Sequence, residues 1–364
     1  MRCKVFSALL LLFVTAVVQA ATKRLFLYVN NNDFENSVSG FEVLPNGTLR
    51  RLPGSPFPTG GLAGRTPNLN SIAVSKKGRM LFVTNNMDNT LSGFYIQSDG
   101  SLRRFAVVST GGMSPTGVVS NKRGTRVLVA NTGSDNIAVF EVANGQIRPV
   151  AGSPFAASNG PVGLVLNKPG TVLFCSNQFT SGVSSFSVDS SGRVKLIGTF
   201  PTLGLQQQGL ALQRKGALLY VTGMASNTVS VLSVDLNTGQ MKLVEGAPFY
   251  TDGDKPLDVA VEPGGRFVYV SNSNSGTITA YETVQGGGLR KLQGSPFLAT
   301  GVGPAGMVFD SSGSLLFVVN GGFGGSKDVS VYKRDSSGRL QPVGSPISTG
   351  SIGIPSGITL VELD

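Results

Sequence analysis

The amino-acid sequence predicts an all-β chain folded as a seven-bladed β-propeller, with four antiparallel strands in each blade. The first observation behind this prediction is the composition, because 49 Gly and 19 Pro in 364 residues disfavour a mainly helical chain. The second is an apolar run that recurs seven times. The third is a mismatch between the two chain ends, which would let the last strand complete the first blade.

The recurring run is short and mostly ends in Asn, as in Leu25 to Asn30 and Phe267 to Asn272. The seven runs end at residues 30, 85, 131, 177, 223, 272 and 320, so successive ends are 55, 46, 46, 46, 49 and 48 residues apart. A fixed period of this length is typical of a solenoid or a propeller.

Three further strands complete each unit. After each run, a polar loop leads to a strand that alternates apolar and polar residues, as in Asn227 to Leu232. A turn such as Asp99-Gly100 leads to the next strand, because such pairs form tight hairpins. Before most runs lies another strand, such as Pro115 to Ser120. Four short antiparallel strands per unit predict a propeller blade.

The chain ends predict that the ring is closed. The first run, Leu25 to Val29, has no strand before it, whereas Pro355 to Val361 is a first strand with no run after it. If this last strand joins the N-terminal three, the blade count is seven and no sheet edge stays open. An open solenoid would need capping repeats, which the sequence lacks. We therefore expect residues 22–364 to form one domain.

Residues 1–21 are expected to be a secretory signal peptide. A basic start with Arg2 and Lys4 precedes the apolar run Val5 to Val18 and the small residues Ala20 and Ala21. The alternative, a retained anchor, is disfavoured because the run is too short to span a bilayer, and no second run follows. The sequence thus predicts a secreted, extracellular protein without a transmembrane span, whose net charge falls from +10 to +8 on cleavage.

Two isolated features of the mature chain carry separate expectations. Cys175 is its one thiol and lies in an apolar run, so we expect a buried structural Cys and no intramolecular disulfide. The sequon Asn46-Gly47-Thr48 lies at an expected hairpin turn and is a candidate glycosylation site.

The composition also excludes several kinds of chemistry. The chain has no His and two Cys, which removes His-dependent triads, His-ligated metals and Cys-cluster zinc sites. Asp252 and Asp254 carry oxygens that suit Ca²⁺, but no loop matches an EF-hand. We therefore expect neither a metal site nor a cofactor.

The repeats resemble those of a known family. Phe82-Val83-Thr84-Asn85 and Tyr220-Val221-Thr222-Gly223 resemble a Tyr-Val-Thr-Asn repeat, and Gly-Ser-Pro-Phe recurs at 54–57, 152–155 and 294–297. With these motifs the chain resembles the lactonase-type seven-bladed propellers, which include bacterial 6-phosphogluconolactonases and fungal carboxymuconate lactonising enzymes. The resemblance implies that His, Arg and Glu side chains in a central funnel transfer protons and bind carboxylates. This chain has no His to match them.

Polar, mostly uncharged side chains are expected at one end of the propeller, where the loops after each run and the segments before each first strand meet. The candidate ligand-binding residues there are Asn85, Asn131, Asn177, Asn272, Asn320, Gln206, Gln207 and Gln208. Such amides suit hydrogen bonds to sugar hydroxyls. The alternative for the repeated Asn is a structural role in turns.

These features leave two function classes open. The first is a non-catalytic or catalytically lapsed binding protein at a cell surface, wall or matrix, with a carbohydrate or protein ligand in the funnel. The alternative is a lactone hydrolase or lactonising isomerase that uses Arg65, Lys255 and either Asp252 or Asp254.

Basic residues are expected at the opposite end. They are Lys76, Lys77, Arg79, Lys122, Arg123, Arg126, Arg214, Lys215 and Arg266 in turns, and Arg50, Arg51, Arg103, Arg104, Arg290 and Lys291 in outer strands. We expect either an attraction to acidic glycans or simple solvation of these turns. Nucleic acid is not an expected partner, because no aromatic stacking pattern accompanies the charges.

Overall fold

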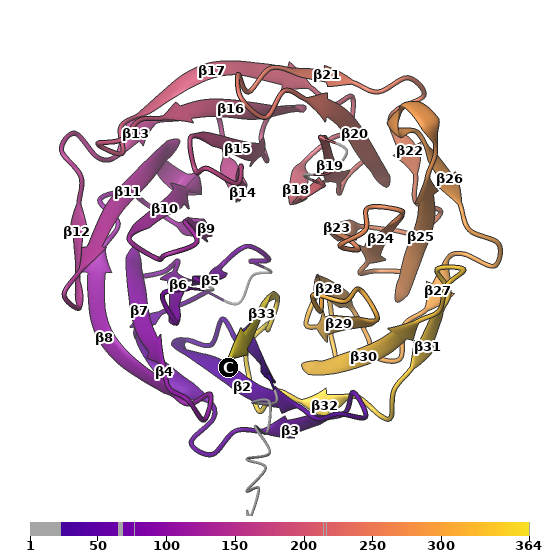
Figure 1. Ribbon diagram of the computed structural model, residues 1–364, viewed down its shortest axis with the longest axis horizontal. Helices are drawn as coiled ribbons and strands as arrows, with labels where there is room; N and C mark the ends of the chain where they lie inside the picture. The colour runs from indigo at the N-terminus through magenta and orange to yellow at the C-terminus, as the bar shows by residue number, and fades with distance from the viewer. Residues whose placement is uncertain (1–22, 65–67, 76, 214, 216, 364) are drawn as a thin grey trace, which may run out of the picture.

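The computed structural model describes residues 23–363 except 65–67, 76, 214 and 216. Seven antiparallel sheets stand in a ring around a central axis (Figure 1), which confirms the predicted seven-bladed β-propeller. The expected signal peptide lies outside the described residues and stays a prediction. No helix in the described part of the chain has the length and apolar character needed to cross a bilayer.

Each blade begins with an inner strand at the axis and continues outward strand by strand. Blade 1 contains β33 (Gly357–Leu363), β1 (Arg24–Asn30), β2 (Glu35–Val43), β3 (Leu49–Arg51) and β4 (Phe57–Leu62). Blade 2 contains β5 (Ile72–Ser75), β6 (Met80–Asn85), β7 (Thr90–Ile96) and β8 (Leu102–Ser109). Blade 3 contains β9 (Pro115–Ser120), β10 (Arg126–Asn131), β11 (Asn136–Ala143), β12 (Gln146–Pro149) and β13 (Phe155–Ala156).

The other four blades repeat this order. Blade 4 contains β14 (Pro161–Leu166), β15 (Val172–Asn177), β16 (Gly182–Val188) and β17 (Val194–Pro201). Blade 5 contains β18 (Gln207–Gln213), β19 (Leu218–Gly223), β20 (Thr228–Val234), β21 (Met241–Leu243) and β22 (Phe249–Tyr250). Blade 6 contains β23 (Pro256–Val261), β24 (Phe267–Asn272), β25 (Thr277–Thr283), β26 (Leu289–Lys291) and β27 (Phe297–Leu298). Blade 7 contains β28 (Pro304–Phe309), β29 (Leu315–Asn320), β30 (Asp328–Arg334), β31 (Leu340–Pro342) and β32 (Ile347–Ser348).

The outermost strand is broken into two pieces in five blades, and both pieces pair with the same third strand. In three of these blades the Ser of the Gly-Ser-Pro-Phe motif lies at the break. Ser55, Ser153 and Ser295 each accept a hydrogen bond at the Oγ from a backbone N–H of the third strand, at 2.8–2.9 Å. The motif therefore provides a hydrogen-bond acceptor for a backbone N–H of the third strand that would have no partner where the outermost strand is interrupted.

The apolar runs form the second strand of each blade, and both of their faces are buried. In β1, Phe26 and Tyr28 pack with residues of blade 2, whereas Leu27 and Val29 pack with residues of blade 7. This two-sided burial explains why the runs are continuously apolar, while the third strands alternate. Cys175 lies in such a run and is fully buried, as predicted, and burial raises the pKa of its thiol to about 12.

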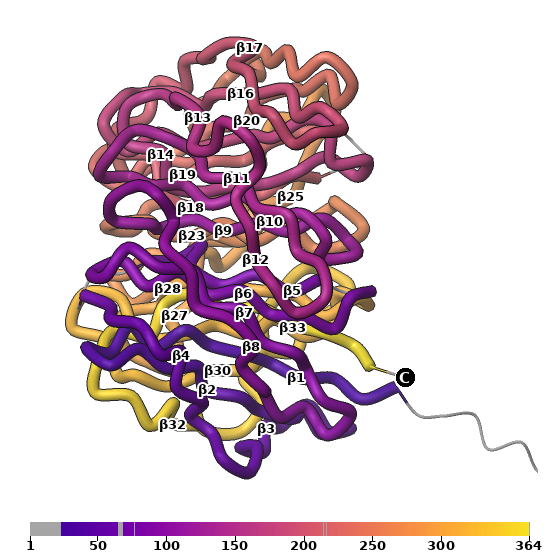
Figure 2. Tube along the Cα trace, turned by 90° about the vertical axis from the view of Figure 1, so that its left-hand side faces the viewer, coloured from indigo at the N-terminus to yellow at the C-terminus, as the bar shows by residue number. Residues whose placement is uncertain are grey.

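The last strand closes the ring, as the chain ends predicted. β33 pairs antiparallel with β1, so that Leu360 lies opposite Leu27 and Val361 opposite Phe26. Both ends of the described chain therefore emerge on the same side of the propeller (Figure 2).

In five blades the Asn at the end of the run is buried within its own blade. The side chains of Asn85, Asn131, Asn177, Asn272 and Asn320 are fully buried. The Asn272 Nδ2 donates to the hydroxyls of Thr277 and Thr279 on the third strand, at 3.1 and 2.8 Å. Corresponding bonds join Asn85, Asn177 and Asn320 to the third strands of their blades. This geometry matches the structural alternative that the sequence left open.

We expect ring closure to depend on the buried face of β33. Leu360→Ala should lower the free energy of unfolding by about 2–5 kcal/mol, because the Leu360 side chain packs between blades 1 and 7. The matched control is Leu298→Ala, which removes a side chain that is 81% exposed and should change the stability by less than about 0.5 kcal/mol. Urea unfolding measures both, and equal losses would contradict the assigned closure.

The run-ending Asn gives a second expectation. Asn272→Ala should cost about 1–3 kcal/mol, since it removes two buried hydrogen bonds and leaves polar groups of the blade without partners. Asn274→Ala removes an exposed amide that bonds only Asp254, and should have little effect. If the two variants unfold at the same urea concentration, Asn272 has no structural role of this kind.

Candidate functional site

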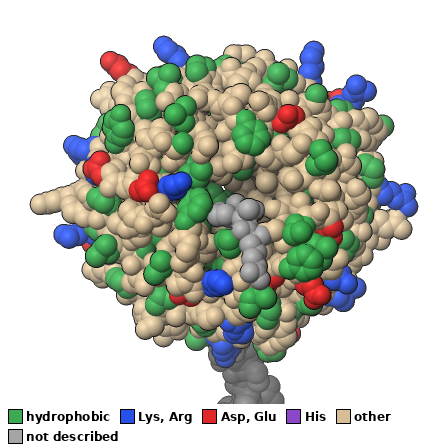
Figure 3. All heavy atoms as spheres, turned by 180° about the vertical axis from the view of Figure 1, so that it is seen from behind, with side chains coloured by type: hydrophobic (Ala, Val, Ile, Leu, Met, Phe, Trp, Pro, Cys, Tyr) green, Lys and Arg blue, Asp and Glu red, His purple; other side chains and the backbone are tan. Residues whose placement is uncertain are grey.

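The two ends of the propeller differ in construction. At one end, the loop end, the loops after the second strands meet the segments that enter the inner strands. Figure 3 shows this face, which is hollowed at its centre. Hydrophobic side chains spread over the face, and most of the charged side chains lie towards its rim. At the opposite end lie the hairpins between inner and second strands and those before the outer strands.

The predicted ligand-binding amides are mostly turned into the blades. The five repeated Asn are buried as described, so a ligand in the centre does not reach them in this structure. Gln206 is exposed, whereas Gln207 and Gln208 are buried. The ligand role of these residues stays a prediction, which their burial does not favour except at Gln206.

Gln207 fills a place that Asn occupies in other blades. In blade 5 the run ends in Gly223 instead of Asn, which leaves room beside Gly204. A Cβ built on Gly204 would lie 3.2 Å from the Gln207 Nε2, just as one built on Gly253 would meet the amide of Asn272. The Gln207 amide therefore lies near the place of the missing Asn, but both of its polar atoms are buried without a hydrogen-bond partner.

The charged candidates of the sequence lie around the mouth and not within it. Asp252 forms an ion pair with Lys291 and is 56% exposed. Asp254 is exposed and accepts a hydrogen bond from the Asn274 Nδ2 at 2.8 Å. The Lys255 ammonium lies 5.1 Å from the centre of the Phe323 ring. Arg65 lies outside the described residues, so the structure brings together no catalytic set from these four.

A different residue stands out once the inner strands are compared. Four of them begin with Pro-x-Gly, at Gly117, Gly163, Gly306 and Gly357, and Gly209 holds the same place after two Gln. A Cβ at Gly117 would lie 2.0 Å from the Val162 carbonyl oxygen of the next blade, and one at Gly306 would lie 2.1 Å from the Ser356 carbonyl oxygen. Close approach of neighbouring inner strands therefore favours glycine, and blade 2 carries the small residue Ser71 here. Blade 6 carries Asp258 at this position.

The Asp258 carboxylate is held between the two neighbouring blades. Its Oδ2 accepts a hydrogen bond from the backbone N–H of Met307 in blade 7, at 2.8 Å. Its Oδ1 faces Gly209 of blade 5, where an added Cβ would lie only 2.5 Å away. The side chain is partly exposed. Loss of hydration among the inner strands raises the pKa of Asp258 from 3.8 to about 7, although hydrogen bonds from Met307 and Val259 oppose the rise.

Amide donors without partners lie at the same level. Asn70 precedes β5, yet a Cβ built on Gly163 of blade 4 would lie 3.1 Å from its Nδ2, so this side chain extends past blade 3. The Asn70 Nδ2 and both amide atoms of Asn68 are buried without a hydrogen-bond partner. Because Gly163 and Gly209 hold equivalent places in adjacent blades, Asn70 and Asp258 approach neighbouring parts of the axis. An acid whose pKa is raised by burial and an N–H donor without a partner thus lie against the inner strands of adjacent blades.

Sequence reasoning missed both residues. The signal for Asp258 was present, since an Asp replaces Gly in the otherwise apolar strand Pro256-Leu257-Asp258-Val259. It becomes visible only when the seven inner strands are aligned and their common glycine is recognised. Asn70 has no such signal, because its importance comes from a contact two blades away.

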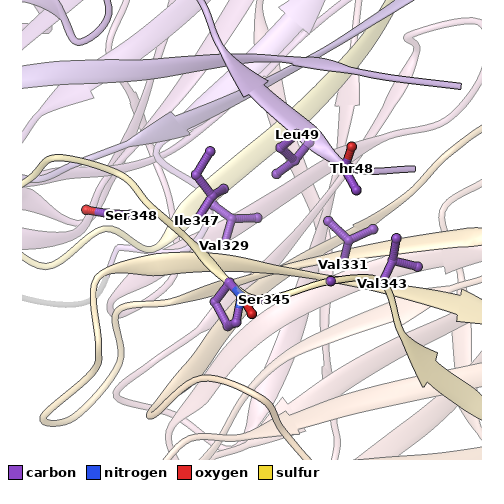
Figure 4. Close-up of a pocket in the computed structure, with 10 residues that line it drawn as sticks. Thr48, Leu49, Val329, Val331, Val343, Ser345, Ile347 and Ser348 are labelled. Carbon is purple, nitrogen blue, oxygen red and sulfur yellow. The ribbon is translucent and has the colours of Figure 1, made fainter. Parts of the chain in front are cut away.

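Three other features are less suited to catalysis. A cavity of about 340 Å³ lies where blades 7 and 1 meet, and its lining is aliphatic apart from hydroxyls, with no ionisable group (Figure 4). The Asn46 Oδ1 accepts hydrogen bonds from the Thr48 N–H and hydroxyl in an exposed turn, so its glycosylation stays a prediction. Within the described residues, no group of three His, Cys, Asp or Glu side chains has the geometry of a metal site.

The basic residues largely lie away from the mouth. Arg266 and Arg290 both pair with Glu282, and Arg50 pairs with Glu42. Lys76 and Arg214 lie outside the described residues. Binding of an acidic glycan by these side chains stays a prediction.

Comparison with solved structures agrees with the fold. A protein of Bacteroides uniformis provisionally named 6-phosphogluconolactonase is 20% identical, with a TM-score of 0.77 over 93% of this chain and 99% of that one. The periplasmic gluconolactonase of Pseudomonas aeruginosa is 18% identical, with a TM-score of 0.73 over 93% and 99%. A protein of Lactobacillus plantarum is 17% identical, with a TM-score of 0.77 over 94% and 100%. At these identities the likeness shows the fold alone.

Comparisons of the sequence identify the family. A search of curated proteins found no match. The family model described as lactonase, 7-bladed beta-propeller, matches residues 17–154, 144–249 and 244–354. Since these matches span nearly the whole chain, the protein belongs to the lactonase family of seven-bladed β-propellers.

Proposed function

We propose that this protein hydrolyses lactones at the axis of the propeller, with Asp258 as the general base. The observation that carries the proposal is the position of Asp258, a carboxylate on the innermost strand whose pKa of about 7 suits proton transfer at neutral pH. Membership of the lactonase family and the names of two similar structures support this reaction over the binding role. Extracellular location stays a prediction from the N-terminal sequence.

The proposed reaction needs one base and one oxyanion donor. The Asp258 carboxylate takes a proton from water, and the hydroxide attacks the lactone carbonyl carbon. The Asn70 Nδ2, which has no partner in the described structure, donates a hydrogen bond to the oxygen that becomes negative. The ring C–O bond then breaks, and the proton on Asp258 passes to the leaving alkoxide, which gives a hydroxy acid.

The missing His does not oppose this mechanism. A general base works best when its pKa lies near the working pH, and an ordinary Asp with a pKa near 3.9 is a weak base there. The inner-strand environment supplies the rise in pKa that the chemistry requires. Asp252 and Asp254 lie instead in an exposed loop, where Asp252 pairs with Lys291.

Asp258→Asn should lower kcat/KM for lactone hydrolysis by about 10²–10⁴-fold, because it removes the base while it keeps an acceptor for the Met307 N–H. Wild-type kcat/KM should rise as the pH increases through about 7, where the carboxylate loses its proton. A pH-stat assay with gluconolactone and γ-butyrolactone between pH 5 and 8 measures both. Asp252→Asn and Asp254→Asn test the rival bases, and a loss confined to these two variants would refute the role of Asp258.

Asp258 also makes a prediction about stability. The folded protein binds the Asp258 proton more tightly than the unfolded chain does, so stability contributed by this group declines as the pH rises from about 4 to about 7. Asp258→Asn should therefore unfold at a higher urea concentration than wild type at pH 8, and at nearly the same concentration at pH 4. The difference between 3.8 and about 7 sets an upper limit of about 4 kcal/mol. An equal effect at both pH values would show that the carboxylate is not destabilised.

A further inference from the structure

Large exposed apolar side chains gather at the loop end. Eleven of the fourteen such side chains among the described residues lie in loops or strand ends on this side. The other three, Val107, Leu196 and Val284, lie on outer strands or at the opposite end. An apolar surface around one opening is typical of a binding site.

The exposure of these side chains follows from a repeated loop structure. Two residues before their inner strands, Met113, Leu205 and Val302 each donate the backbone N–H to a serine hydroxyl of the same blade. The acceptors are the Oγ atoms of Ser134, Ser226 and Ser326, at 2.9–3.0 Å. Because the backbone is fixed in this way, the side chains point outward and are 53–60% exposed.

Three of these side chains flank Asp258. Leu205 enters the strand that carries Gly209, which faces the Asp258 Oδ1. Val302 enters the strand that carries Met307, whose N–H binds the Asp258 Oδ2. Phe323 lies in the next loop of blade 7, where its N–H donates to the Ser273 Oγ of blade 6 at 3.0 Å. Exposed apolar side chains of blades 5 and 7 therefore stand on both sides of blade 6, which carries the carboxylate.

We propose that the substrate is a lactone that carries an apolar chain. The lactone ring enters between the inner strands at Asp258, and the chain lies against Leu205, Val302 and Phe323. This inference rests on the proposed hydrolase function.

The direct test measures hydrolysis of γ-lactones whose alkyl substituent grows from none to eight carbons. Wild-type kcat/KM should rise with chain length, by up to about fourfold for each methylene that is fully buried. Leu205→Ser and Val302→Ser should flatten this rise, because they remove apolar surface against which the chain lies. The matched control is Leu196→Ser, since Leu196 is 48% exposed on an outer strand.

A binding measurement separates this inference from the proposed reaction. Calorimetry with γ-lactams of the same chain lengths, on wild type and on Asp258→Asn, reports affinity without turnover. Tighter binding of long-chain lactams that is lost in Leu205→Ser supports the apolar site, even if no lactone is hydrolysed and the proposed function fails. Hydrolysis of γ-butyrolactone with no dependence on chain length keeps the proposed function and overturns the inference. Variants that change only binding to phosphatidylcholine vesicles would also overturn it.

Discussion

The close approach of the inner strands around the axis is the constraint on which the rest of the molecule depends. Five inner strands shift register near their first residues, which removes a backbone N–H from the regular ladder. In blade 4 the Ser176 hydroxyl accepts the N–H of Gly163 and donates to the Gln208 carbonyl of blade 5. Thr222 and Ser271 make the same pair of bonds in blades 5 and 6. The bonds that complete one blade thus bind it to the next.

This arrangement explains why a carboxylate at the inner-strand position that most blades fill with glycine has a raised pKa. Asp258 takes part in the network through its own N–H, which donates to Ser271, so its backbone cannot shift to bring the side chain into water. The carboxylate loses hydration and its pKa rises to about 7. The absence of His from the composition suggested a lapsed enzyme. General-base catalysis requires a group whose pKa lies near the working pH, whatever the residue type. An Asp held in a partly dehydrated position can have such a pKa.

The fold could be predicted from the sequence because every blade repeats the same apolar run, polar loop and turn. Each of these patterns is weak evidence by itself, but their regular repetition seven times is strong evidence. The site could be predicted only in part, because sites are departures from the repeat. Gln207 was one of the candidate residues, yet it is buried and its amide lies beside Gly204, near the place of the Asn missing at Gly223. Asp258 replaces a glycine that most other inner strands carry, but this departure is visible only when the strands of different blades are compared. The contact of Asn70 with Gly163 joins blades 2 and 4, and nothing local in the sequence encodes it.

The two ends of the ring also differ in how freely their residues can be substituted. At the hairpin end, the Tyr28 and Tyr269 hydroxyls bind the carbonyls of Gly100 and Gly338 in the next blades, at 2.7 Å. Both glycines have a positive φ, and an added Cβ would meet Phe26 or Phe267 within 2.7 Å. Each hairpin there is therefore part of the contact between blades. At the loop end, serine hydroxyls of the same blade satisfy the backbone and leave the side chains unconstrained. A propeller built in this way can vary its surface most freely at the loop end, where the strand that carries Asp258 begins.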